Sequence, residues 1–147
     1  MSGFRFRLQR VLNYREDMEK EAQSILAGAR ISLQESLTEL AGMKYELTEV
    51  YNVQKTGSES LDVNGRLFCA RYIDHLSKRI SVTEQAVQEK EDKVSEKRSD
   101  LETRMLERKM LSSLKERQST AFNMEIKLSE QKMNDEFALN GYSRRQG

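Results

Sequence analysis

Thr56-Gly57-Ser58-Glu59-Ser60-Leu61-Asp62-Val63-Asn64-Gly65-Arg66 is the one clear interruption in a sequence that otherwise has a helical pattern from end to end. Gly permits positive φ, and Ser, Asp and Asn side chains compete with helical hydrogen bonding. A long helical pattern precedes this stretch, and a longer one follows it. Two long helices joined by a short polar turn predict a hairpin, with the turn at about residues 56–66.

The composition argues against a compact globular domain. Charged residues make up 33% of the 147 residues and hydrophobic residues only 37%, and the chain has no Trp and no Pro. A helix hairpin buries one narrow stripe on each helix, so it needs little apolar surface. The absence of Pro fits long helices, because an interior Pro costs about 3 kcal/mol.

Residues 4–54 are expected to form the first helix, because apolar residues recur there in steps of mostly three and four, the coiled-coil spacing. The positions that predict its buried seam are Leu8, Val11, Met18, Ala22, Ile25, Ala29, Leu33, Leu37, Leu40, Met43, Leu47 and Val50.

The second helix is expected at about residues 67–139, with Asn64 as its N-cap and Asn140-Gly141 as its stop. Its predicted seam is Cys69, Ile73, Leu76, Ile80, Val87, Val94 and Leu101. Polar residues at the interleaved positions Thr83, Lys90 and Lys97 leave that seam under-filled. The spacing then indicates a stutter, after which the seam would resume. The residues on which this interpretation rests are Met105, Leu106, Met110, Leu114, Ala121, Met124 and Leu128.

The predicted fold is therefore all-α: an antiparallel two-helix coiled-coil hairpin with the second helix longer than the first, forming a single domain over residues 1–147. Folding the chain about residue 61 places Leu47 near Ile73 or Leu76, and Leu8 near Leu114. The end of the second helix then overhangs the N-terminus. This overhang is expected to expose Phe122, Met124, Leu128, Met133 and Phe137.

The sequence contains no pattern for catalysis, a cofactor or a metal. His75 is the only His and Cys69 the only Cys, so a zinc site lacks ligands. No GxxxxGK[ST] loop occurs. The net charge of +1 gives no reason to expect a nucleic-acid partner. No secretory signal and no membrane-spanning apolar run is visible, so membrane association is expected only peripherally, through partners.

The mixed charges after Glu84 are expected to support a solvated helix face. The spacing predicts ion pairs between residues four apart. These pairs are Glu89 with Lys93, Arg98 with Glu102, and Asp100 with Arg104.

Two ends of the hairpin are candidate interaction surfaces. At the turn end, Tyr51, Phe68 and Tyr72 provide more aromatic surface than a two-helix seam needs, although they could simply cover the turn. At the end with the termini, Phe4 and Phe6 alternate with Arg5, Arg7 and Arg10. This alternation could dock on an acidic protein surface or anionic lipid, or it could be a frayed, solubilising end.

The opening Phe4-Arg5-Phe6-Arg7-Leu8-Gln9-Arg10-Val11-Leu12-Asn13-Tyr14-Arg15-Glu16, followed by Glu19-Lys20-Glu21-Ala22, resembles the start of the FliJ family. The length, the single break near residue 60 and the ending Met133-Asn134-Asp135-Glu136-Phe137-Ala138 are also similar to that family.

The resemblance implies a non-catalytic, stalk-like, cytoplasmic component of the bacterial flagellar type III export apparatus, peripheral at the cell membrane, linked to flagellum biogenesis and chemotaxis. The implied partners are the export ATPase (FliI), the export gate protein (FlhA), the ATPase regulator (FliH) and export chaperones. The implied ATPase-binding end is Phe4, Arg5, Phe6, Leu8, Arg10 and Val11. The implied gate-binding end is Leu47, Tyr51, Tyr72, Leu76 and Arg79.

A second class of function remains open from the residues alone. The long second helix and its under-filled seam are also typical of an adaptor or scaffold that self-associates through residues 115–140. A stalk should be a monomeric hairpin, whereas a scaffold should dimerise. An enzyme is the least favoured class.

Overall fold

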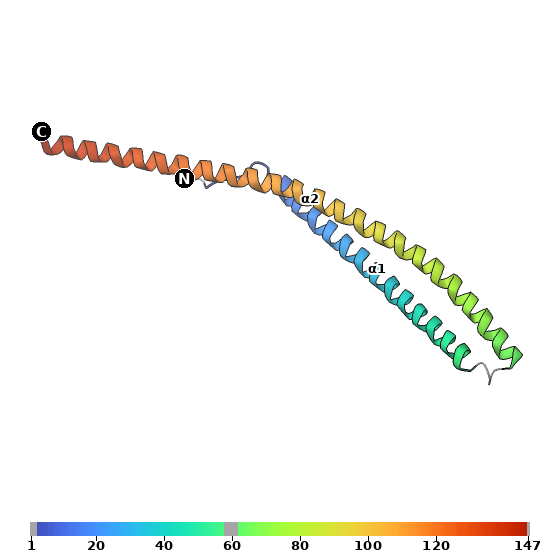
Figure 1. The fold of residues 1–147 in the computed structure, drawn as a ribbon. Helices are drawn as coiled ribbons and strands as arrows, with labels where there is room; N and C mark the ends of the chain where they lie inside the picture. Colours follow the sequence, from blue (N-terminus) through green and yellow to red (C-terminus); the bar gives the residue numbers. More distant parts are fainter. Residues whose placement is uncertain (1–2, 58–61, 147) are drawn as a thin grey trace. The chain divides into compact units, whose positions relative to one another are not determined.

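The computed structural model describes residues 3–57 and 62–146, which form two helices: α1, Gln9–Thr56, and α2, Val63–Gln146 (Figure 1). They contain 48 and 84 residues, and no strand occurs in the described part of the chain. The all-α hairpin with a longer second helix is confirmed. The chain divides into two compact units, each with a segment of both helices. Unit 1 is residues 1–20 and 103–147, and unit 2 is residues 21–102.

Asp62, and not Asn64, caps the start of α2. Its carboxylate Oδ1 accepts a hydrogen bond of 2.7 Å from the Gly65 N–H, which is the third residue of the helix. Gly65 therefore lies in the first turn of α2, and no described glycine has a positive φ. The freedom of Gly to adopt a positive φ is therefore not used at Gly65. The four central residues of the expected turn, 58–61, lie outside the described residues.

The helix bounds differ from the predicted ones at both termini. Residues 4–8 precede α1, and the Gln9 N–H donates 3.1 Å to the Phe6 carbonyl oxygen. The side chain of Phe6 is buried, which holds this segment off the helical path. At the other end α2 runs through Gly141 to Gln146. An isolated Gly costs only about 1 kcal/mol in a helix, so it need not end one.

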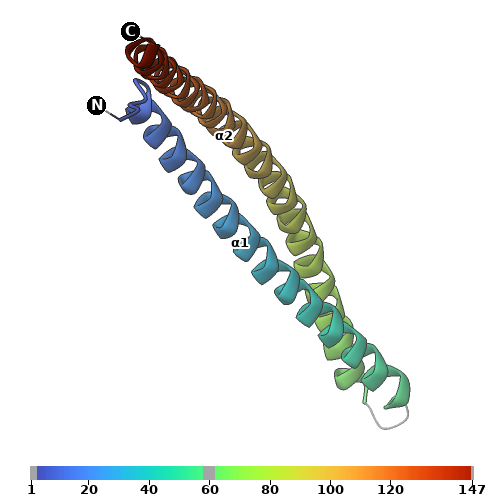
Figure 2. The same cartoon turned by 90° about the vertical axis from the view of Figure 1, so that its left-hand side faces the viewer.

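In unit 2 the two helices run side by side in opposite directions around an apolar core (Figures 1 and 2). Its centre is the buried cluster of Leu40, Met43, Ile80 and Val87. The partly buried residues Leu33, Leu37 and Leu47 pack against this cluster. On α2, the predicted seam residues Cys69, Leu76, Ile80, Val87 and Val94 are all buried.

A polar layer crosses the seam of unit 2. Ser36 is only 6% exposed, and its hydroxyl oxygen accepts a hydrogen bond of 2.6 Å from Lys90 Nζ. The same ammonium group lies 3.3 Å from the Ser32 carbonyl oxygen. Together with the half-buried Thr83 and Lys97, this layer confirms that the α2 seam is under-filled with apolar side chains.

The seam of α1 lies one residue away from the predicted one over part of its length. The exposed residues include the predicted Leu8, Val11 and Ile25, whereas Leu12 and Leu26 are buried. One set of buried and half-buried positions runs in unbroken steps of three and four. It consists of Leu12, Arg15, Glu19, Ala22, Leu26, Ala29, Leu33, Ser36, Leu40, Met43, Leu47 and Val50. The predicted seam residues Met18 and Leu37 are half-buried beside this set. Polar residues at Glu19 and Ser36 hid this register from an apolar count.

The predicted stutter in α2 is wrong for the same reason. One set of buried and half-buried positions of α2 continues in steps of three and four without a break. It consists of Ile80, Thr83, Val87, Lys90, Val94, Lys97, Leu101, Arg104, Arg108, Leu111 and Lys115. The seam of α2 therefore includes charged residues, and the spacing of its positions does not change along the helix.

The apolar residues that suggested the stutter, except the half-buried Met105, belong to a different face of α2, which we call the outer stripe. All its members are exposed, so it is not the continuation of the seam. It consists of Leu106, Met110, Leu114, Arg117, Ala121, Met124 and Leu128.

The overhang of α2 is present but shorter than predicted. Ile126 is the last half-buried residue, and every residue from 127 to 146 is exposed, Met133 and Phe137 among them. In Figure 1 this part of α2 has no neighbouring helix. Phe122 was expected to be exposed, but it is half-buried because it packs against Phe4.

Candidate interaction surfaces

The N-terminal segment of unit 1 folds back onto α2 and does not fray. Phe6 is buried, and the ring of Phe4 lies 5.8 Å from the ring of Phe122. The expectation of two exposed Phe residues is therefore wrong, because both rings are used in packing. The predicted surface that remains exposed at this end is Arg5, Leu8, Arg10 and Val11.

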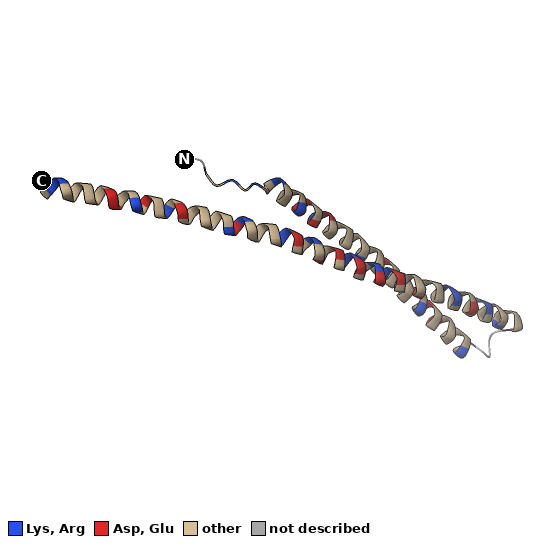
Figure 3. Ribbon diagram, turned by 90° about the horizontal axis from the view of Figure 1, so that it is seen from above, with Lys and Arg blue, Asp and Glu red and all other residues tan. Residues whose placement is uncertain are grey.

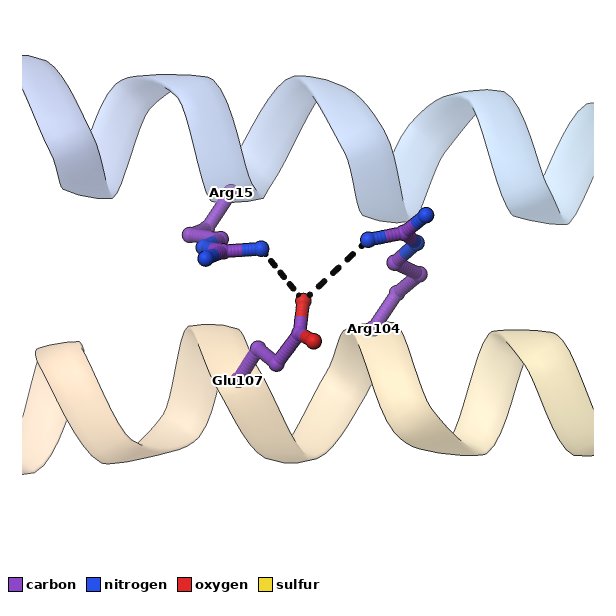
Figure 4. A network of polar contacts seen from close by, with 3 residues as sticks. All are labelled: Arg15, Arg104 and Glu107. Carbon is purple, nitrogen blue, oxygen red and sulfur yellow. Dashed lines mark hydrogen bonds and ion pairs between the residues drawn. The ribbon is translucent and has the colours of Figure 1, made fainter.

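Charged residues of α1 and α2 make two ion-pair contacts inside unit 1. Arg15 Nη1 lies 2.6 Å from Glu107 Oε2, and Arg104 Nη1 approaches the same oxygen at 3.4 Å (Figure 4). The Arg108 guanidinium donates to both carboxylate oxygens of Glu19, at 2.6 and 3.3 Å. Bidentate pairs of this kind fix the relative orientation of the two groups as well as their distance.

The Glu19–Arg108 pair changes the acid–base properties of the guanidinium. The hydrogen bond to the Glu19 carboxylate raises the pKa of Arg108 above its ordinary value. An Arg side chain is charged in any case, and its pairing with Glu19 links α1 to α2 within unit 1.

Acidic and basic residues alternate along α2 (Figure 3), yet none of the three predicted pairs forms an ion pair among the described residues. Arg104 pairs with Glu107, and Lys97 pairs with Asp100, at 3.8 Å. The ion pairs of α2 between Glu84 and Lys109 instead join residues one or three apart, or join α2 to α1. The Arg15–Glu107 ion pair could be predicted from the position of the turn. Folding the chain about residue 61 places these two residues opposite each other.

At the turn end of unit 2, Tyr72 is the centre of a small polar and aromatic group. Its hydroxyl donates to the Glu46 carboxylate, and its ring stacks on that of Phe68, with centroids 6.3 Å apart. The hydrogen bond to Glu46 is the main cause of the raised pKa of Tyr72. Phe68 is 70% exposed, so the stack presents one free aromatic face.

The predicted gate-facing residues divide into an inner and an outer set. Leu76 is 0% exposed and Leu47 is half-buried, so both contribute mainly to the seam. Tyr51 and Arg79 are exposed, and Tyr72 is half-buried. The sequence had predicted Leu47 and Leu76 as seam residues, and the family resemblance also placed them in the gate-binding set.

The model of the family described as "Flagellar FliJ protein" matches residues 4–147. The chain belongs to the FliJ family. It is therefore a component of the flagellar protein export apparatus. Neither the curated proteins nor the solved structures that were searched gave a match.

In this FliJ-family chain the described residues provide surfaces and no metal cluster. No group of three or more His, Cys, Asp and Glu side chains among them could hold a metal ion. None of the described helix segments is long and apolar enough to cross a membrane. Within these residues, the features available for recognition are exposed side chains on α1, on α2 and on the N-terminal segment.

Proposed function

We propose that this FliJ-family chain is a non-catalytic stalk that couples the export ATPase ring (FliI) to the export gate (FlhA). It would do so in the cytoplasm, peripheral to the membrane through its partners, with the ATPase regulator (FliH) and export chaperones as further partners. The observation that carries the proposal is the family match over residues 4–147. The two-helix hairpin supports it, because a hairpin can present a separate surface at each end.

For the ATPase we propose the exposed side of the N-terminal end as the contact surface. Leu8 and Val11 are 39% and 41% exposed, and they lie beside the exposed Arg5 and Arg10. Apolar side chains flanked by Arg suit a protein surface with acidic residues. Phe4 and Phe6 support this surface from behind, because their rings are packed against the hairpin.

For the gate we propose the outer set at the turn end. Tyr51, Arg79 and the Phe68–Tyr72 stack offer aromatic and guanidinium groups, the types that binding hot spots favour. Leu47 and Leu76 hold the two helices together below this set, so they act on gate binding through the fold.

The test is to mix the purified chain with its cognate export ATPase and measure ATP hydrolysis and oligomeric state together. A stalk should raise hydrolysis and favour hexamers that carry one copy of the chain. The double variant Leu8→Gln, Val11→Gln should weaken ATPase binding about tenfold and leave gate binding unchanged. Tyr51→Ala with Arg79→Ala should do the reverse. If each double variant weakens both interactions equally, the assignment of one partner to each end is wrong.

A self-associating scaffold is the second candidate, and one observation favours it. Met133 and Phe137 are 53% and 70% exposed in the part of α2 that has no neighbouring helix. They stand on the side of the helix that carries Phe122 and Ile126, so a second copy could cover them. Sedimentation equilibrium decides between the candidates, since a stalk stays monomeric and a scaffold forms dimers that Phe137→Glu dissociates.

A further inference from the structure

The outer stripe of α2 has the spacing of a second coiled-coil seam. Its members follow one another in steps of four, four, three, four, three and four, from Leu106 to Leu128. Such a spacing keeps the residues on one side of a helix, because α-helical residues advance by about 100° each. The stripe lies entirely within unit 1 and covers about six helical turns.

The outer stripe is distinct from the seam that α2 forms with α1. Leu111, Lys115 and Phe122 are half-buried, and they project from the side of α2 opposite to Leu106 and Met124. Leu106, Met110, Met124 and Leu128 are 62%, 73%, 59% and 61% exposed. In this unit α2 therefore has two apolar faces, of which the hairpin uses one.

An open groove runs along the N-terminal half of the stripe. Its lining includes Leu106, Met110, Leu114, Lys109 and Arg117. A row of large apolar side chains beside a groove is the surface that accepts the apolar face of an amphipathic helix. The length and the straight path of the stripe match a helix better than a loop or an extended peptide.

The charges on the outer stripe indicate which side chains the partner's helix must present. Arg117 stands in the middle of the stripe, and Lys109 and Lys127 flank it on one side. None of these three residues has an ion-pair partner among the described residues. A partner that covers the stripe must offer an acidic side chain opposite Arg117, because a buried, unpaired guanidinium is costly.

A second copy of the chain fits this surface poorly. In a parallel, in-register pair the two Arg117 side chains would face each other, and an antiparallel pair centred on the stripe would also bring them together. Like charges at such positions oppose pairing. The stripe between Leu106 and Leu128 holds no carboxylate among its own seven residues that could neutralise them.

We propose that the outer stripe binds an amphipathic α-helix of another protein, with leucine-type residues at its seam positions and an acidic residue facing Arg117. The bound helix would lie along α2, so that three helices would run side by side in part of unit 1. This inference goes beyond the proposed function, whose contacts on unit 1 are those of the N-terminal end.

The test uses two designed helical peptides with the full-length chain. Both carry leucine at every seam position, and one has Glu and the other Lys at the position facing Arg117 and along the flank facing Lys109 and Lys127. Fluorescence anisotropy measures their binding. The Glu peptide should bind at least tenfold more tightly than the Lys peptide. Arg117→Glu should reduce this preference, and Lys109 and Lys127 should account for what remains of it. Met110→Gln with Leu128→Gln should weaken binding of the Glu peptide at least tenfold.

The control variant is Val82→Gln, an equally exposed apolar position of α2 in unit 2 (67% exposed). It should leave binding of the Glu peptide unchanged. Circular dichroism checks that every variant keeps its helix content, which is expected because all the altered residues are exposed. Equal binding of the two peptides, no binding of either, or loss of binding with Val82→Gln would overturn the proposal. So would a dimer of the chain alone that Met110→Gln with Leu128→Gln dissociates.

Discussion

The rings of Phe4 and Phe122 lie 5.8 Å apart with an angle of 47° between their planes. This contact joins the segment that precedes α1 to α2 inside unit 1. Tilted aromatic pairs at this separation are favourable beyond the area that they bury. The N-terminal end is therefore held in a defined position, and the exposed Leu8 and Val11 beside it have a fixed support.

Phe122→Ala should release the N-terminal segment. We expect the free energy of unfolding to fall by about 1–2 kcal/mol, less than for a fully buried Phe, because Phe122 is half-buried. Amide hydrogen exchange at Leu8 and Gln9 should become faster. The matched control is Phe137→Ala, which removes a ring that is 70% exposed on the same helix and should change neither quantity. Unchanged exchange in Phe122→Ala would show that the ring contact does not hold the segment.

Leu76→Ala should be among the most damaging single changes in unit 2. Among residues 3–57 and 62–146, Leu76 is the one large side chain that is 0% exposed, and truncating a buried Leu costs about 2–5 kcal/mol. Chemical denaturation measures this cost. Leu76→Met conserves the volume and should cost less than about 1.5 kcal/mol. If Leu76→Met keeps the free energy of unfolding but abolishes binding of the gate protein, Leu76 contacts that partner directly. This result would contradict our assignment of Leu76 to the inner set.

Replacing the polar layer by apolar residues should stabilise unit 2. In the double variant Lys90→Leu, Ser36→Ala, both members of a 2.6 Å hydrogen bond are removed together, so no buried polar group loses its partner. Such replacements of buried polar groups often stabilise by about 1–4 kcal/mol. The single variant Lys90→Leu should gain less, because the Ser36 hydroxyl then stays buried without this donor. A double variant that is less stable than the natural chain would show that the layer contributes to stability.

Tyr72 should ionise at a higher pH in the folded chain than in the unfolded chain. Its hydrogen bond to Glu46 raises its pKa above the ordinary value of a tyrosine. Because the folded pKa lies above the unfolded one, the stabilisation is fully present below the unfolded pKa and is lost as the pH rises through the folded value. Tyrosinate absorbance in an alkaline titration measures this. Glu46→Gln should lower the midpoint of Tyr72, and Tyr72→Phe should remove its contribution; a titration curve that neither variant changes contradicts the assignment.

Much of the fold could be predicted from residue types alone. The absence of Pro, the polar break at residues 56–66 and the apolar steps of three and four predicted two long helices in a hairpin. The predicted pairing of residues across the two helices was also close to the observed one, because folding about residue 61 places Arg15 opposite Glu107. These features follow from local conformational preferences and chain geometry, which the sequence states directly.

The candidate surfaces depended on side-chain positions that the apolar pattern did not reveal. Glu19 and Arg108 occupy seam positions, and the count of apolar residues placed the predicted seam on Val11 and Ile25. A coiled-coil seam tolerates a charged residue when the facing helix supplies a partner, as Glu19 does for Arg108. Which side chains pair across the two helices depends on the tertiary structure, and the sequence of one helix alone does not reveal it.

The sequence by itself determined the two helices, their order, their unequal length and the position of the turn, because these depend on intrinsic propensity and spacing. Tertiary structure alone decided which faces of the two helices are covered in unit 1. It placed Phe6 inside and Leu8 outside, and it left the outer stripe exposed on α2. The physical reason is that α2 carries two apolar faces, and only packing against α1, with the ion pairs that accompany it, selects one of them as the seam.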